Sequence, residues 1–148
     1  MIKLVATDLD DSLLKNDLTI SDKNLKAIEF LKDNNIILIL ATGRPYPSIK
    51  SYTHKLSLEN PVIAYQGALV YNPKDDTGLY RCEIEPFDAK KIIDLARKNN
   101  VHVHVYIDNV WYVEEFNEKV EYYKNLTGLQ PCIVDNFILF IKKPVTKI

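Results

Sequence analysis

Residues 2–14, IKLVATDLDDSLL, decide the fold. Ile, Leu, Val and Ala fill the first half of this stretch, and the apolar run stops abruptly at Asp8, Asp10, Asp11 and Ser12. A short, continuous apolar run is typical of a parallel strand that is buried on both faces. The acidic residues therefore lie at the carboxyl end of a strand, which is where ligands bind in open α/β sheets.

The spacing of Asp8 and Asp10 favours a metal site. If the backbone stays extended, both side chains lie on one side of the strand, about 7 Å apart, because the side-chain period of a strand is two. Mg²⁺ takes oxygen ligands and usually binds through one or two carboxylates together with a substrate phosphate. An ordinary acidic turn is the alternative, since Asp and Ser are common turn residues. This stretch alone leaves both interpretations open.

The composition argues against several classes of function. The 148 residues include 19 basic and 20 acidic side chains, and no run of like charge would attract nucleic acid or a membrane surface. The N-terminus shows no cleavable apolar segment, and the apolar runs are too short to cross a bilayer, so we expect a cytoplasmic protein. Cys82 and Cys132 are too few and too isolated for a disulfide framework or a zinc site.

A second strand follows a helix. Ser21 is a good N-cap, and Leu25 and Ile28 continue after it at helical spacing. Residues 36–41, IILILA, are another apolar run of strand length. The order strand, helix, strand predicts a parallel sheet, and a right-handed crossover places the second strand beside the first.

The turn after this second strand is suited to a phosphate. Gly43 lets the backbone approach a ligand closely, Thr42 and the amides of the next helix offer hydrogen-bond donors, and Arg44 can hold a phosphate in a planar fork. Phosphoryl transfer depends mostly on positioning and charge neutralisation, so a donor-rich turn opposite two carboxylates suits it. One carboxylate could attack phosphorus while its neighbour moves protons. A plain helix-start turn is the alternative.

The remaining sequence predicts a third strand and then a smaller α/β layer. Residues 61–65 form a short apolar run that ends in Gln66 and Gly67, and residues 69–71 and 79–84 flank a hairpin signature. Further on, we expect Asp88 to cap one helix, and Asn117 to cap another that ends at Gly128.

Residues 101–107, VHVHVYI, alternate strictly and predict a strand. Val101, Val103 and Val105 would then face a core, while His102 and His104 share the opposite face. Two histidines on one face could bind a metal or a substrate. We interpret them instead as the solvated face of an alternating strand. The nearby aromatic residues are interpreted as core packing rather than as a substrate pocket.

Three motifs of the sequence resemble those of a known family. The motifs DLDDSLL (8–14), LATGRP (40–45) and AYQGALVYN (64–72) are similar to those of the haloacid dehalogenase-like hydrolases, in particular the small-metabolite phosphatases called Cof-type. The resemblance implies an α/β fold with a doubly wound, Rossmann-like parallel core, here incomplete, followed by the first part of an α/β cap. The corresponding division is residues 1–79 for the core and 80–148 for the cap, which in the family is mobile, closes over the site and sets substrate choice.

The resemblance also implies roles for individual residues. Asp8 would be the nucleophile that forms an aspartyl phosphate, and Asp10 the general acid and base. Asp8 and the backbone carbonyl of Asp10 would bind Mg²⁺. Thr42 and the Gly43 amide would hold the transferring phosphoryl group, and the turn at Gln66 and Gly67 would contact the substrate.

Two departures from the family pattern stand out. Members usually have Gly or Asp followed by Thr where this chain has Asp11 and Ser12, although Ser12 keeps the hydroxyl. They usually have Asn where this chain has Gln66. Family members also continue beyond residue 148 with a lysine that neutralises the phosphoryl charge and an acidic group that completes the Mg²⁺ shell, so we expect a truncated chain.

The sequence therefore predicts a Mg²⁺-dependent phosphatase acting on a small phosphorylated metabolite, such as a sugar phosphate, with no nucleic-acid or membrane partner. A phosphomutase of the same family is one alternative. Another is a non-catalytic fragment that folds as a homo-dimer or with a completing chain, because an apolar parallel strand left at a sheet edge invites pairing. A receiver-like phosphoacceptor domain ranks last, since it would need an Asp at the end of a later strand.

Overall fold

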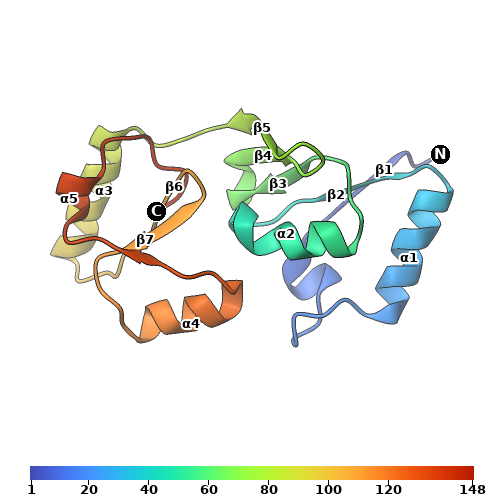
Figure 1. Cartoon of the computed structure of the whole chain (residues 1–148), viewed down its shortest axis with the longest axis horizontal. Helices are drawn as coiled ribbons and strands as arrows, with labels where there is room; N and C mark the ends of the chain where they lie inside the picture. The colour runs from blue at the N-terminus through green and yellow to red at the C-terminus, as the bar shows by residue number, and fades with distance from the viewer. The chain divides into compact units, whose positions relative to one another are not determined.

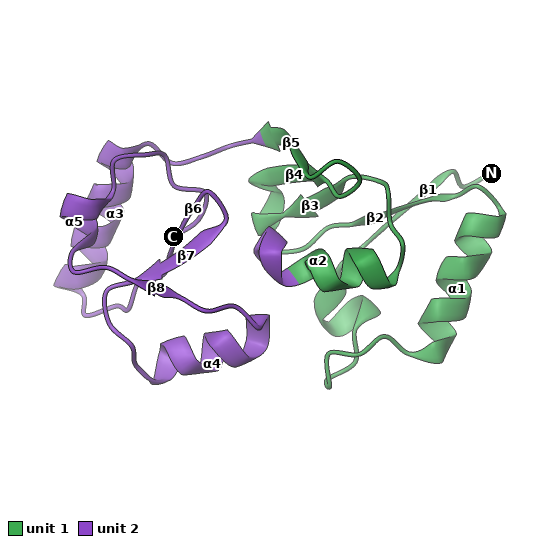
Figure 2. Ribbon diagram, in the orientation of Figure 1, with its two compact units in different colours: residues 1–44, 49–80 green, residues 45–48, 81–148 purple.

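The computed structural model describes residues 1–148 and divides into two compact units (Figures 1 and 2). Unit 1 comprises residues 1–44 and 49–80, and unit 2 comprises residues 45–48 and 81–148. Each unit has its own small sheets and helices. No helix is both long enough and apolar enough to cross a membrane.

Parallel pairing at the start of the chain organises unit 1. Strands β1 (Leu4–Thr7) and β2 (Ile37–Leu40) pair in parallel, and Ala41 forms a parallel bridge to Ile63 of β3 (Val62–Ala64). Helix α1 (Asp22–Asp33) connects β1 to β2, and α2 (Tyr46–Lys55) connects β2 to β3 (Figure 1). These parallel strands with helical connections confirm the predicted α/β class.

The prediction that the first strand is buried on both faces was wrong. The side chain of Leu4 is 48% exposed, and that of Ile37 beside it is 44% exposed. Strand β1 has β2 as its single neighbour, so it lies at a sheet edge. An apolar strand of this kind lacks the cover that a neighbour on its other side would provide.

Helix α1 begins where the sequence indicated. The Ser21 side chain accepts a hydrogen bond from the backbone N–H of Asn24 at 3.1 Å, which satisfies one of the free amides at the helix start. Ile28 is buried, and the helix ends at Asp33 with Asn34 as its C-cap. The helix therefore holds β1 and β2 at the spacing of a parallel crossover.

Strand β3 leads into a hairpin of β4 (Leu69–Asn72) and β5 (Thr77–Arg81) through the turn η2 (Tyr65–Gly67). Strands β3 and β4 are antiparallel, and β4 is the middle strand of the three. The last predicted strand, residues 79–84, lies further along the chain than the observed β5. Its final residue, Ile84, instead exchanges backbone hydrogen bonds with Val145 at 2.8 and 2.9 Å.

Unit 2 is a small α/β layer. Its sheet has the order β6 (Val105–Ile107), β7 (Val110–Val113), β8 (Cys132–Ile133). Helices α3 (Pro86–Lys98) and α5 (Phe137–Phe140) lie on one side of these strands, and α4 (Glu118–Thr127) lies on the other (Figure 1). The core on the α3 side consists of Ala89, Ile93, Val105, Ile107, Phe137, Ile141 and Val145.

Two predictions in unit 2 need correction. Helix α3 starts at Pro86 with Glu85 as its N-cap, so Asp88 lies inside the first turn, because proline is preorganised for the first helical position. The strand predicted for residues 101–107 is confined to residues 105–107. Val101 donates its N–H to Ala96 at the end of α3 and is 56% exposed, so the segment joins β7 only from Val105 onward.

Helix α4 was predicted correctly. The Asn117 side chain accepts hydrogen bonds from the N–H groups of Lys119 and Val120, at 3.1 and 3.2 Å. Gly128 closes the helix in the left-handed conformation, with φ = 71°. Residues other than glycine rarely adopt this backbone conformation, which explains why a glycine stands at position 128.

Candidate active site

The carboxyl ends of three strands of unit 1 lie side by side. The backbone N–H of Ala41 donates to the carbonyl of Thr7 at 2.9 Å, and that of Thr42 donates to Ile63 at 2.9 Å. Gln66 in turn donates its N–H to the carbonyl of Thr42 at 3.1 Å. These bonds hold the residues that follow β1, β2 and β3 at one edge, as the sequence argument required.

A pocket of about 320 Å³ opens at this edge. Its lining is Asp8, Ala41, Thr42, Gly43, Ile63, Gln66 and Gly67. The structure thus brings one predicted carboxylate together with both predicted turns, which come from three different strand ends. Asp10, Ser12 and Arg44 do not line this pocket.

Asp8 presents a carboxylate to the pocket. Its backbone is extended, with φ = -75° and ψ = 165°, and its Oδ1 accepts the N–H of Leu9 at 2.6 Å, which caps the turn η1 (Leu9–Leu13). The other oxygen, Oδ2, accepts no hydrogen bond within the chain. Asp8 is exposed, so this oxygen is available to a ligand.

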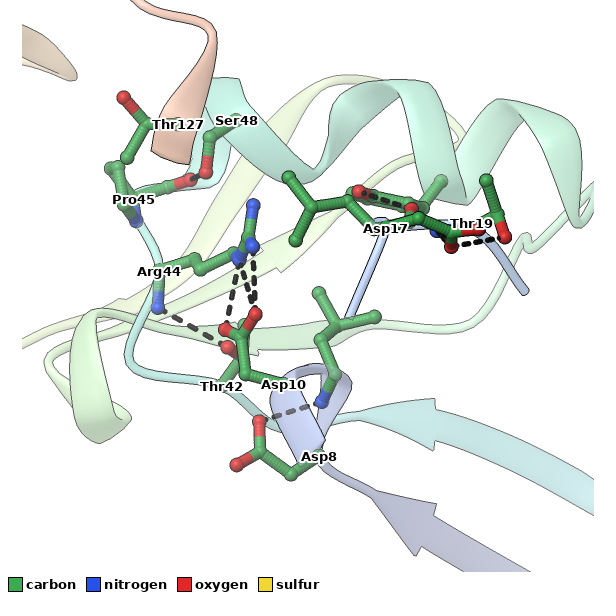
Figure 3. Close-up of polar contacts among 12 residues, drawn as sticks. Asp8, Asp10, Asp17, Thr19, Thr42, Arg44, Pro45, Ser48 and Thr127 are labelled. Atoms are coloured by element: carbon green, nitrogen blue, oxygen red, sulfur yellow. Dashed lines mark hydrogen bonds and ion pairs between the residues drawn. The ribbon is translucent and has the colours of Figure 1, made fainter. Parts of the chain in front are cut away.

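Asp10 faces a different group. Arg44 Nη2 lies 2.7 Å from Asp10 Oδ1, and Arg44 Nε lies 2.9 Å from Asp10 Oδ2, so the guanidinium holds the carboxylate at two points. Figure 3 shows the Asp10 carboxylate turned toward Arg44, and the Asp8 carboxylate turned toward the Leu9 N–H. The chain enters η1 directly after Asp8, so the extended backbone that would place both carboxylates on one side does not continue.

The turn at Gln66 packs against the turn at Gly43. A Cβ atom added to Gly43 would lie 3.1 Å from Cγ of Gln66, closer than most such contacts. Tyr65, Gln66 and Gly67 all have positive φ, of 50°, 57° and 96°. Successive left-handed residues other than glycine are strained, and such strain gathers where the chain shapes a ligand site.

Several features of the site have no clear signal in the sequence. The pairing of Arg44 with Asp10 joins residues 34 positions apart, and only their opposite charges hint at it. Tyr65 is not a turn-forming residue, yet it adopts a left-handed conformation while its side chain is 3% exposed. Ser12 lies exposed in η1 and has no hydrogen bond that would assign it a role.

The residues present fit a hard divalent cation through few protein ligands. Nowhere in the chain do three or more His, Cys, Asp or Glu side chains converge on one point. Mg²⁺ commonly uses one or two carboxylates and completes its shell with water and substrate phosphate. The Asp8 carboxylate, with its open Oδ2, meets that requirement, whereas the Asp10 carboxylate is engaged by Arg44.

Comparison with known proteins finds a family of hydrolases and several relatives that are named phosphatases. The family described as haloacid dehalogenase-like hydrolase matches residues 5–148. The 5-amino-6-(5-phospho-D-ribitylamino)uracil phosphatase YitU of Bacillus subtilis is 38% identical over 112 residues, which cover 74% of this chain and 42% of the relative. The pyridoxal phosphate phosphatase YbhA of Escherichia coli is 25% identical over 112 residues, which cover 76% of this chain and 41% of that protein.

A solved structure has a similar fold along almost the whole chain. A protein from Thermotoga maritima superimposes with a TM-score of 0.82 at 32% identity, over 99% of this chain and 55% of its own. The chain spans about half the length of the curated relatives it matches. The structural likeness therefore extends across both units of this chain, while the matches cover 42% of YitU, 41% of YbhA and 55% of the Thermotoga protein.

Proposed function

Because the chain belongs to the haloacid dehalogenase-like hydrolases, we propose that it carries the nucleophile and the phosphoryl-binding turns of a phosphatase for small phosphomonoesters. The observation that carries the proposal is the single pocket shared by Asp8, Thr42 and Gly43. Residues 80–148 are proposed to be the first part of the cap.

The first step is attack on phosphorus. One carboxylate oxygen of Asp8 forms the new P–O bond while the bond to the leaving oxygen breaks, which gives an aspartyl phosphate. For this step Asp10 must carry a proton, which it gives to the leaving oxygen and takes back in the second step. The Gly43 N–H and the Thr42 hydroxyl are donors at the pocket wall, where the phosphoryl oxygens gain negative charge.

The second step returns the enzyme to its starting state. A water attacks the aspartyl phosphate, its proton passes to Asp10, and Asp8 leaves as a carboxylate with inorganic phosphate as the product. Mg²⁺, held by Asp8 and the Asp10 carbonyl, would neutralise phosphoryl charge when bound. Arg44 fixes the direction of the Asp10 carboxylate, so its role is to position the proton donor rather than to hold phosphate.

The substrate is proposed to be a small phosphorylated metabolite. YitU is named for a phosphorylated ribitylamino-uracil and YbhA for pyridoxal phosphate, so a phosphate ester of a small ring or sugar-like compound is the class to test first. A phosphomutase would use the same aspartyl phosphate but would return the phosphoryl group to a second hydroxyl of the substrate.

Phosphate release from a panel of sugar phosphates and pyridoxal phosphate, with and without Mg²⁺, tests the proposal. We expect turnover that requires Mg²⁺ and is abolished by Asp8→Asn, which keeps the size of the side chain but removes the nucleophile. Glu59→Gln, an exposed acid in the same unit, is the matched control. Turnover that survives Asp8→Asn would exclude the mechanism. Conversion to an isomeric phosphate without release of phosphate would favour the mutase.

The open edge of β1 supports a second candidate, a module that works with further polypeptide. Leu4 and Ile37 expose apolar surface at the edge strand and its neighbour, and Phe30 on α1 is 62% exposed. We propose that additional polypeptide pairs with β1 and covers these side chains. Light scattering across a concentration series tests whether a second copy fills this role. A monomer at every concentration, with turnover by the chain alone, would contradict the module.

A further inference from the structure

Strand β5 is the second outer strand of unit 1. The bridge between Ala41 and Ile63 joins the pair of β1 and β2 to the sheet of β3, β4 and β5, in which β4 is the middle strand. Strands β1 and β5 are therefore the two outer strands, and Figure 1 shows β5 beyond β4. An edge strand presents backbone N–H and C=O groups that no neighbouring strand bonds, so it is a template for another strand.

Strand β5 is uncovered on both of its faces. It is the longest strand of the chain, with the sequence TGLYR over Thr77–Arg81, and all five residues are exposed. Leu79 is 56% exposed and Tyr80 is 53% exposed. Consecutive residues of a strand point to opposite faces, so each face carries one large apolar side chain. Edge strands are commonly protected by proline or by charged side chains, and β5 has a charge only at its last residue.

The sequence of β5 is complementary to itself when two copies run antiparallel. Most homo-oligomers have closed symmetry, and a two-fold axis perpendicular to the sheet pairs an edge strand with its own copy in this way. The register that uses all five residues places Leu79 opposite Leu79 of the second copy. Gly78 then lies opposite Tyr80, and Thr77 lies opposite Arg81. This register places no like charges opposite each other within the strand.

Each cross-strand pair in this register has compatible chemistry. On one face the two Leu79 side chains meet, and an apolar pair directly opposite stabilises an antiparallel sheet. The Thr77 hydroxyl on the same face can accept a hydrogen bond from the Arg81 guanidinium. On the other face the Tyr80 ring lies across Gly78, which has no side chain, and an aromatic ring in this position covers the backbone that the glycine leaves open.

The two ends of β5 carry opposite charges. Asp75 and Asp76 directly precede the strand, and Arg81 ends it. Within the chain Arg81 Nη1 lies 3.5 Å from Glu83 and 3.7 Å from Asp108, so its ion pairs are long and leave the side chain 40% exposed. An antiparallel pair of strands brings the basic end of one copy to the acidic start of the other, which favours this partner and this direction.

We propose that β5 is a dimerisation edge, at which a second copy of this chain pairs its own β5 antiparallel with Leu79 at the two-fold axis. The inference concerns the opposite edge of unit 1 from β1 and does not depend on the phosphatase reaction. One strand of five residues makes an interface of the small, transient class, so the dissociation constant is expected to be of the order of 100 μM.

Sedimentation equilibrium of the 148-residue chain, from about 10 μM to about 1 mM, measures the association. Leu79→Lys places two lysines opposite each other and should weaken it by at least about tenfold. Leu4→Lys, at the β1 edge, is the matched control and should leave it unchanged, as should Asp8→Asn, which separates this test from that of the phosphatase. A monomer at every concentration, or association that Leu79→Lys leaves unchanged, would overturn the proposal.

Disulfide cross-linking tests the register, and it decides the matter if circular dichroism shows that Leu79→Lys is unfolded. The two exposed cysteines, Cys82 and Cys132, are first replaced by serine. Leu79→Cys then places two thiols directly opposite, with Cβ atoms about 5 Å apart, close to the separation in a disulfide. Thr77→Cys, on the same face, is the control, because its two thiols would lie about 14 Å apart. We expect Leu79→Cys to form a linked dimer at least about tenfold faster on a non-reducing gel. Equal rates, or no linked dimer, would overturn the proposed pairing.

Discussion

Arg44 grips Asp10 through two hydrogen bonds from one guanidinium, of 2.7 Å from Nη2 and 2.9 Å from Nε. The arginine is 7% exposed, whereas the aspartate side chain is 42% exposed. Such a fork fixes the plane of the carboxylate as well as its distance. The pair therefore ties the turn after β2 to the turn after β1, and the acid keeps its direction without a covalent link.

Replacing this arginine should cost both stability and turnover. For Arg44→Gln we expect a loss of about 2 kcal/mol in the free energy of unfolding, between the values for exposed and for buried ion pairs, because only one partner is buried. Urea unfolding followed by circular dichroism measures it. Arg81→Gln is the control, since Arg81 is 40% exposed and meets its acids only at 3.5 and 3.7 Å, and should cost less than about 1 kcal/mol.

Enzyme kinetics can distinguish whether Arg44 directs the Asp10 carboxylate or only stabilises the fold. If Arg44 directs Asp10, Arg44→Lys should lower kcat more than it raises KM and should change the pH profile of kcat, because lysine keeps the charge but not the planar fork. A folded Arg44→Lys chain with an unchanged pH profile would contradict the positioning role.

The sequence was informative where local pattern and topology agree. The apolar runs of β1 and β2, the cap at Ser21 and the glycine turn after β2 all reflect short-range constraints, and the parallel crossover then brings the strand ends together. The convergence of Asp8 with Thr42 and Gly43 followed from these rules alone.

Side-chain orientations and burial that depend on residues far apart in the sequence could not be predicted in this way. The orientation of Asp10 depends on Arg44, and the burial of His104 depends on Trp111 and Tyr123, which come from other elements. A period of two along residues 101–107 cannot show whether another element covers the second face. The exposure of β1 likewise depends on neighbours that lie elsewhere.

The contact between Gly43 and Gln66 leads to a prediction about packing. Gly43→Ala places a methyl group 3.1 Å from Cγ of Gln66, and this flexible side chain must move to admit it. We expect a loss of about 1 kcal/mol in stability, and its recovery in the double variant Gly43→Ala/Gln66→Ala. Urea unfolding of the four chains in a double-mutant cycle measures the coupling. Additive effects would show that the two turns do not touch.

The left-handed backbone at Gln66 predicts a substitution that stabilises the folded chain instead of destabilising it. Asparagine tolerates a φ of 57° better than glutamine, because its short polar side chain can hydrogen-bond locally. Gln66→Asn should therefore raise the free energy of unfolding by about 0.5 kcal/mol. Gln130→Asn, an exposed position without positive φ, is the matched control and should not stabilise the chain. Equal effects of the two substitutions would place the cause outside the backbone conformation.

The buried histidines make stability depend on pH. The pKa of His104 falls from 6.5 to about 4 in the folded chain, chiefly through burial. Between these two values the unfolded chain binds the extra proton and the folded chain does not, so stability rises with pH across this window and is lost as the pH falls from 6.5 toward 4. We expect the melting temperature to drop by a few degrees over that range.

In His104→Phe, which keeps a ring against Trp111, the drop should be smaller, with the remainder contributed by His102, whose pKa is also lowered. His54→Phe, at an exposed site, should behave as the unsubstituted chain. Parallel melting curves of these chains at pH 7 and pH 4.5 decide the point, and an equal drop in all three would show that neither the burial nor the stacking of His104 governs its protonation.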